Sequence, residues 1–299
     1  MFIRKILSEF KLRIKSALMI FCLACFGSLQ LQANEYLFQY NSQLPLRSDY
    51  ELAVLKLVLE STKDDYGDFN ITTEESGYTI ARQIKIAQER AQIFLWASPY
   101  NSLNTDLAII EYPIFQGAFG LRSIVVHKDN LQKINSVSTL SELKQFSVGQ
   151  GPGWMDVTIY KHHGFNVIEA RLTKLFNMAA NKRFDLLPLG RLEIDNEILA
   201  TKTSGDELIV APHHMIHYPH PVLFHLNVKH TQAISRLNDG MREITQNGAL
   251  AALFNQHFSH VTAQLKQQDT IVFELENNTL PTKYLQRMKD LRIIQRDRN

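Results

Sequence analysis

Residues 139–154 read Thr-Leu-Ser-Glu-Leu-Lys-Gln-Phe-Ser-Val-Gly-Gln-Gly-Pro-Gly-Trp and carry several local signals in a row. Thr139 and Glu142 form a capping box, in which the hydroxyl and the carboxylate satisfy free amides at a helix start. An apolar strand over Phe146–Gly149 and a glycine-rich turn follow. The pattern then predicts a helix over Trp154–His163, which Gly164 ends as a left-handed cap. Elements in this order are typical of an α/β fold.

The segments on either side continue the same alternation. The run Glu35–Tyr40 predicts a first strand, and Ser48-Asp-Tyr-Glu51 is a second capping box that is expected to open a helix through Ser61. Further strands are expected at 165–168 and 184–188, and further helices at 172–182 and from Ile234 to Gly248. Short apolar runs that alternate with amphipathic segments predict an α/β architecture with largely parallel strands.

The composition is that of a folded chain whose body carries little net charge. The 299 residues are 45% hydrophobic and 21% charged, which is enough for one large or two ordinary domains. Five of the 32 basic residues and one of the 30 acidic residues lie in residues 1–33, so the rest of the chain has 27 basic and 29 acidic residues. Nucleic acid is therefore not expected as a partner, because its binding needs clustered basic residues.

Residues 1–33 are expected to be a signal peptide. A basic region from Arg4 to Lys15 precedes an apolar run, and the segment ends at the small residue Ala33. The apolar run is about 13 residues long, whereas a helix that spans a bilayer needs about 20. Cleavage before Asn34 would make the protein periplasmic.

Two other fates of the N-terminus remain open, namely a retained membrane anchor and acylation at Cys25. Cys22 and Cys25 are the only cysteines, and both lie in this leader. Residues 34–299 therefore have no thiol, which excludes thiolate metal sites and disulfides there.

Several motifs together resemble those of the bacterial periplasmic solute-binding proteins of family 3, the amino-acid-binder-like class. The resemblance covers residues 34–258. Within that class, the chain is similar to a poorly characterised branch. The motifs that carry it are Leu140–Gly151, Asn181–Asp185, Tyr112–Arg122, Gly149–Asp156, Glu193 and Tyr218–Phe224.

The resemblance implies a two-lobed clamp of the type II periplasmic-binding-protein fold, with two crossing strands. Its first lobe would comprise residues 34–119 and 221–259, and its second lobe residues 120–220. Residues 260–299 would form a C-terminal extension that packs back on the first lobe. A small ligand would lie in the cleft between the lobes of a monomer, with no cofactor, for transfer to an ABC transporter or a sensor.

The glycine-rich turn supplies the first candidate ligand-binding residues, Gln150, Gly151, Trp154 and Asp156. Its glycines would let the backbone approach a ligand, and free amides at the following helix start favour an anionic group. A turn without a ligand is the alternative. Trp154 is expected either to stack on the ligand or to pack between the lobes. Asp156 is also favoured in the first turn of a helix by the helix dipole alone.

Other candidates lie near the expected crossings. Arg122 has the planar geometry to hold a carboxylate through two hydrogen bonds, and a structural salt bridge at the hinge is the alternative. Glu193 would meet a ligand amine, or pair with Arg191 or a helix start. Tyr40, Tyr112 and Tyr218 would form walls of the cleft, or pack in the core or the hinge.

Five histidines, which raise the question of a metal site, lie close together at 213, 214, 217, 220 and 225. The metalloprotease pattern His-Glu-x-x-His is absent, and prolines at 212, 219 and 221 disfavour a helix that would bring the rings together. No metal is therefore expected. Solvated or hinge-lining histidines are the simpler interpretation.

The leading hypothesis is an exported, non-enzymatic solute-binding protein that holds a small polar or anionic molecule. Two alternatives stay open. One is a histidine-based, metal-dependent hydrolase, and the other is a degenerate clamp that acts as an interaction module without a ligand.

Overall fold

The computed structural model describes residues 34–42, 44–75, 78–100, 107–194, 207–265 and 269–290. The predicted signal peptide and both cysteines lie outside these residues. Among the described helices, none combines the length and the hydropathy that crossing a bilayer would demand.

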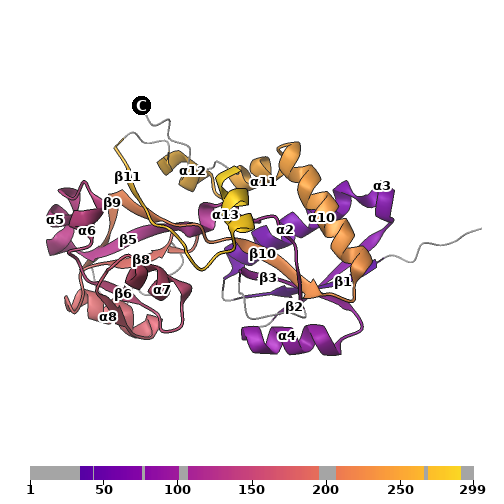
Figure 1. Ribbon diagram of the computed structural model, residues 1–299, viewed down its shortest axis with the longest axis horizontal. Helices are drawn as coiled ribbons and strands as arrows, with labels where there is room; N and C mark the ends of the chain where they lie inside the picture. The colour runs from indigo at the N-terminus through magenta and orange to yellow at the C-terminus, as the bar shows by residue number, and fades with distance from the viewer. Residues whose placement is uncertain are drawn as a thin grey trace, which may run out of the picture.

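One five-stranded sheet organises the first lobe, in the order β2-β1-β3-β10-β4. Helices α2 (Pro45–Ser61) and α10 (Thr231–Gln246) pack on one face, and α4 (Ile80–Glu89) covers the other (Figure 1). Helices α3 (Lys63–Tyr66) and α11 (Ala249–His257) complete this lobe. The strands are β1 (Asn34–Tyr40), β2 (Phe69–Glu75), β3 (Ile93–Pro99), β4 (Leu107–Ile109) and β10 (Val222–Asn227).

A four-stranded sheet, in the order β11-β9-β5-β8, organises the second lobe, together with the strand pair β6-β7. Its strands are β5 (Leu121–His127), β6 (Val148–Gln150), β7 (Val167–Glu169), β8 (Leu187–Gly190), β9 (Leu208–His217) and β11 (Ile271–Glu274). Its helices are α5 (Leu131–Asn135), α6 (Leu140–Leu143), α7 (Met155–His162) and α8 (Leu172–Ala180). Two helices follow α11, namely α12 (Ser259–Leu265) and α13 (Thr282–Asp290).

The α/β prediction is confirmed, whereas the prediction of largely parallel strands holds for only part of each lobe. β1 pairs in parallel with β2 and β3, and β6 pairs in parallel with β7. β10 runs antiparallel to β3 and β4, and β5 runs antiparallel to β8 and β9. Both of the antiparallel strands β5 and β10 directly follow a passage of the chain from one sheet to the other.

Local helix signals are confirmed at α6 and α7 and wrong at α2. Thr139 and Glu142 make both hydrogen bonds of a capping box at α6, and Gly164 follows α7 with a left-handed φ of 84°. The capping box at Ser48 is wrong, because α2 already begins at Pro45. The Ser48 hydroxyl instead accepts a hydrogen bond from the amide of Asn41 and donates one to its carbonyl oxygen.

Between β4 and β10 the chain crosses between the sheets twice, through residues 110–120 and through residues 218–221. The two crossings touch at Gly120 and Tyr218, where the Tyr218 amide donates a hydrogen bond to the Gly120 carbonyl over 3.4 Å. A Cβ atom on Gly120 would lie only 1.8 Å from the Tyr218 carbonyl oxygen. The crossings can therefore lie side by side only because residue 120 has no side chain.

We predict that Gly120→Ala pushes the crossings apart. The free energy of unfolding should fall by about 1–3 kcal/mol or more, since 1–3 kcal/mol is the usual cost of overpacking. Chemical denaturation followed by circular dichroism measures this loss. Lys174→Ala, at an exposed position of α8, is the control and should leave the stability within about 0.5 kcal/mol. A Gly120→Ala protein as stable as this control would contradict the close approach.

Candidate functional site

A cavity of about 700 Å³ lies between the two lobes. Its walls come from the first lobe, from the second lobe, from both crossings and from the C-terminal segment. The lining residues are Leu44, Arg47, Pro99, Tyr100, Phe119, Arg122, Gly153, Trp154, Met155, Asp156, Val157, Thr158, Pro188, Leu189, Gly190, Glu193, His220 and Thr279.

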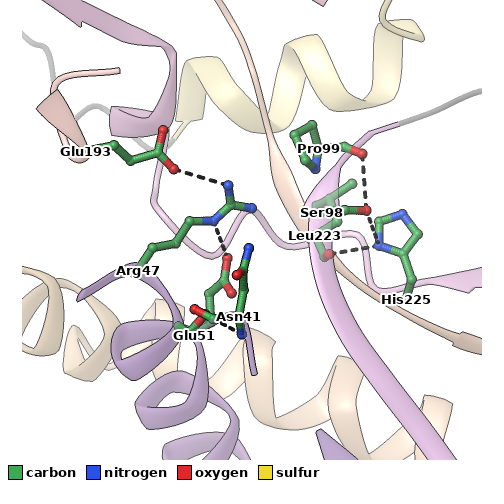
Figure 2. Close-up of polar contacts among 9 residues, drawn as sticks. Asn41, Arg47, Glu51, Ser98, Pro99, Glu193, Leu223 and His225 are labelled. Carbon is green, nitrogen blue, oxygen red and sulfur yellow. Dashed lines mark hydrogen bonds and ion pairs between the residues drawn. The ribbon is translucent and has the colours of Figure 1, made fainter. Parts of the chain in front are cut away.

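Arg47 joins the lobes across this cleft (Figure 2). Its Nε donates to Glu51 Oε1 over 2.8 Å on the same helix, and its Nη1 donates to Glu193 Oε1 over 3.2 Å on the second lobe. Burial alone would lower the pKa of Arg47, but the two carboxylates outweigh burial and raise it. For Glu51, burial prevails over Arg47 and raises the pKa of the carboxyl group.

Arg122 forms a second charged cluster, at the base of the cleft. Its Nε donates to Asp156 Oδ1 over 2.9 Å and to the Tyr218 hydroxyl oxygen over 2.6 Å, and its Nη1 donates to the Phe119 carbonyl over 2.8 Å. The Tyr218 hydroxyl donates to the same Asp156 oxygen. Burial would raise the pKa of Asp156, but Arg122 and the other hydrogen bonds hold it below its usual value. Arg122 is only 5% exposed, so its charge is neutralised inside the protein.

The glycines of the turn at 149–154 make room for aromatic rings. A Cβ atom on Gly151 would lie 2.3 Å from the Trp154 ring, and one on Gly149 would lie 2.3 Å from the Phe184 ring. The Trp154 side chain, on a residue that is 36% exposed, thus rests on its own turn and lines the cleft. Gly153 has a φ of 80°, which a residue with a side chain rarely adopts. The indole ring thus occupies the space that a side chain at residue 151 would need, and the approach of a ligand to the backbone at Gly151 stays a prediction.

Four of the nine predicted ligand-binding residues line the cleft, namely Arg122, Trp154, Asp156 and Glu193. Gln150 and Tyr218 are fully buried behind them, where the Gln150 side-chain amide donates to the Pro188 carbonyl over 2.9 Å. Tyr40 and Tyr112 lie away from the cleft lining. The Tyr40 hydroxyl donates to Asp49, and Tyr112 packs against the core of the first lobe.

Other cleft residues were not among the predicted ligand-binding residues, namely Arg47, Phe119, Tyr100 and Thr279, and His220 was considered only as a metal ligand or as a solvated or hinge-lining histidine. The Arg47 guanidinium lies 4.8 Å from the centre of the Phe119 ring, so the two side chains form one wall. A usable signal for Arg47 was Pro45, which is favoured at the first position of a helix and places Arg47 in its first turn. A cation there is disfavoured by the helix dipole unless acidic partners compensate it.

A side chamber of about 180 Å³ adjoins the cleft behind Arg47. Both cavities share Leu44, Arg47 and Pro99. The chamber is also lined by Gln39, Ser48, Glu51, Gln83, Trp96 and Ser98. Its walls include two buried polar atoms, Trp96 Nε1 and Gln83 Oε1, that have no hydrogen-bond partner among the residues that the structure describes. The chamber therefore offers hydrogen-bonding groups next to the main cleft.

The clustered histidines point to different neighbours. His213 pairs with Asp269 at 2.8 Å, His217 pairs with Glu274 at 2.6 Å, and His214 Nε2 contacts the Val137 carbonyl oxygen at 2.9 Å. Within the residues that the structure describes, no three metal-binding side chains come together.

The last two histidines of the cluster are buried. His225 stacks on Trp96, with ring centres 5.5 Å apart, and His220 lies 5.4 Å from Phe119. Burial lowers the pKa of His220 to about 3 and that of His225 to about 4. Both rings are therefore neutral at pH 7.

We predict that Asp156→Asn lowers the free energy of unfolding by about 3–5 kcal/mol, because it leaves the buried Arg122 charge without its partner. The pKa of Asp156 is lower in the folded state, so its contribution is present above the unfolded value of about 3.9 and is lost as the pH falls through the folded value. The difference between variant and wild type in urea denaturation should therefore shrink in strong acid. A difference that is the same at pH 7 and pH 3 would contradict this assignment.

We also predict a loss of stability in mild acid from His220 and His225. Their folded pKa values lie below the unfolded value of about 6.5, so the unfolded chain binds protons first as the pH falls. Each should remove roughly 2 kcal/mol of unfolding free energy between pH 6.5 and pH 5. Urea denaturation of wild type and of His225→Gln at both pH values isolates one of them. An unchanged pH slope in the variant would show that the ring is not buried in its neutral form.

No family model matches the chain, and no curated protein matches it. Solved structures do match. The YckB protein of Bacillus subtilis is 16% identical with a TM-score of 0.50, and the match covers 81% of this chain and 96% of that one. An ancestral arginine-binding protein bound to arginine is 11% identical with a TM-score of 0.50, and the match covers 77% of this chain and 100% of that one.

A third structure comes from work on glutathione import through GshT and the cystine importer TcyBC of Streptococcus mutans. It is 13% identical with a TM-score of 0.50, and the match covers 76% of this chain and 96% of that one. At such identities the matches bear on the fold. The chain has the two-lobed α/β fold of the type II periplasmic binding proteins.

Proposed function

We propose that this protein is an exported, non-enzymatic solute-binding protein. It holds a small polar molecule in the cleft between its lobes and passes it to an ABC transporter or reports it to a sensor. The observation that carries the proposal is the cleft itself, which is lined by charged side chains from both lobes. Its volume of about 700 Å³ falls within the range of about 300–1,000 Å³ that is usual for small-molecule sites.

The proposed mechanism is closure of the lobes around the ligand. A ligand shifts the balance between open and closed forms only if it binds one of them better. Groups that face each other across the cleft, such as Arg47 and Glu193, supply that difference because both can reach one ligand only when the lobes are close. No covalent step is needed.

The charged side chains of the cleft favour a ligand that carries hydrogen-bond donors as well as hydrogen-bond acceptors. Arg122 is neutralised by Asp156, and Arg47 is shared between Glu51 and Glu193. A simple anion would have to compete with these carboxylates for a guanidinium group. A zwitterion or a neutral polar molecule can instead exchange hydrogen bonds with both charges and with the side chamber. Amino acids fit this description, and one of the similar structures holds arginine.

The proposal includes a cleaved signal peptide and the lobe boundaries that the resemblance implies. Residues 1–33 direct export and are removed, so the functional chain begins at Asn34 in the periplasm. Its lobes comprise residues 34–119 with 221–259, and residues 120–220, followed by an extension over 260–299.

We predict that at least one small zwitterionic or polar metabolite stabilises residues 34–299 after denaturation and refolding have removed any bound ligand. Thermal unfolding with single amino acids, dipeptides and dicarboxylates measures this effect. A ligand at about 100 times its Kd adds roughly 2.7 kcal/mol to the unfolding free energy. If no probe shifts the midpoint, and mass spectrometry finds nothing bound to the protein before refolding, the binding function is wrong.

The same assay tests the site. Glu193→Gln keeps the shape of the side chain but removes the charge that faces Arg47, so the Kd of the stabilising probe should rise at least tenfold, which is about 1.4 kcal/mol. The matched control is Glu169→Gln, the same change on β7 of the same lobe and outside the cleft lining. Equal Kd values for the two variants would move the ligand away from this cleft.

A further inference from the structure

The C-terminal segment 269–290 contacts both lobes. It begins beside the second lobe and ends on the first, and Figure 1 shows it in yellow as it runs across the middle of the molecule. The resemblance implies an extension that packs back on the first lobe. Helix α13 does contact that lobe, and β11 in addition joins the edge of the sheet in the second lobe.

The attachment to the second lobe is extensive. β11 pairs in parallel with β9, from Ile271 opposite His214 to Glu274 opposite His217. Phe273 and Leu275 are buried in the core of this lobe, and the Leu275 amide donates to the His217 carbonyl over 2.8 Å. This part of the segment is therefore an integral strand of the sheet.

The next residues contact the second crossing and the cleft. Asn277 is only 2% exposed, and its side-chain amide donates to the Pro219 carbonyl over 2.8 Å. Its side-chain oxygen accepts hydrogen bonds from the amide of Thr279 at 3.0 Å and from its hydroxyl at 2.6 Å. This turn places Thr279 in the wall of the cleft.

Helix α13 then reaches the first lobe. The Tyr284 ring, on a residue that is 2% exposed, lies 4.7 Å from the ring of Tyr100, which also lines the cleft. Lys283 forms an ion pair with Glu111 in the first crossing. The side chain of Met288 lies 3.5 Å from the place where a Cβ atom on Gly117 would be, in the same crossing.

We propose that residues 274–288 are a strap, a connection between the lobes in addition to the two crossings and to the passage from α11 through α12 to β11, and that this strap limits how far the cleft opens and keeps Thr279 at its wall. The two crossings alone would allow the lobes to rotate about them as a hinge. A link that is anchored on both sides must stretch or detach when the lobes separate. Its far anchor is the buried Tyr284, so wide opening would expose that ring and break its contact with Tyr100.

The opening of the ligand-free protein can be measured directly, whether or not a ligand is known. Residues 34–299 contain no cysteine, so Lys85→Cys on α4 and Lys174→Cys on α8 give one exposed spin-label site on each lobe. Pulsed electron spin resonance then gives the distribution of distances between the lobes. The reference is the doubly labelled chain with the strap intact.

Two strap variants are compared with this reference. A chain that ends at Glu276 keeps β11 and loses the rest of the strap, and Tyr284→Ala removes only the buried ring that holds α13 against Tyr100. Both should show longer and more widely spread distances than the reference. A chain that ends at Asp290 keeps α13 and should match the reference.

Should the shorter chain fail to fold, as judged by circular dichroism, Tyr284→Ala alone decides the question. Distances in Tyr284→Ala that equal the reference or are shorter would overturn the strap, and this result would leave the proposed ligand binding untouched.

Discussion

The arrangement of the cleft depends on the buried charge of Arg122. A guanidinium group that is taken out of water is tolerated only if carboxylates and other acceptors compensate it. Asp156 on α7, Tyr218 in the second crossing and the Phe119 carbonyl in the first do so. These hydrogen bonds to Arg122 hold the start of α7 against both crossings. The turn before α7, and Trp154 with it, thereby faces the first lobe.

The same compensation decides what the cleft can bind. Because Asp156 already neutralises Arg122, the base of the cleft presents a closed ion pair and not an open anion site. Arg47 and Glu193 differ, because their contact spans the two lobes at 3.2 Å and both line the cavity. A ligand that replaces this contact can gain from both partners. Selectivity should therefore arise where the lobes meet, more than at the buried pair.

The sequence predicted features that depend on neighbouring residues better than contacts between residues that are far apart in the chain. The capping box at Thr139 and the left-handed Gly164 need only neighbours within a few residues, and both were predicted correctly. Arg122 was recognised, yet its partners Asp156 and Tyr218 lie 34 and 96 residues away, so the sequence left both a ligand contact and a salt bridge open. The Arg47 contact with Glu193 spans 146 residues. The contact of the Trp154 ring with its own turn at Gly151 was not predicted, because no local pattern specifies that this ring folds back.

The C-terminal segment combines a structural and a mechanical role. β9 would otherwise leave its backbone groups unpaired at the edge of the sheet, and β11 covers that edge. The strand that covers the edge continues into α13, whose Tyr284 contacts Tyr100. Protection of the edge and restraint of the hinge therefore come from one segment. A strand that ended at Glu274 would suffice for the first role. The buried Asn277 and Tyr284 have no part in covering the edge, so their burial is best explained by the second role.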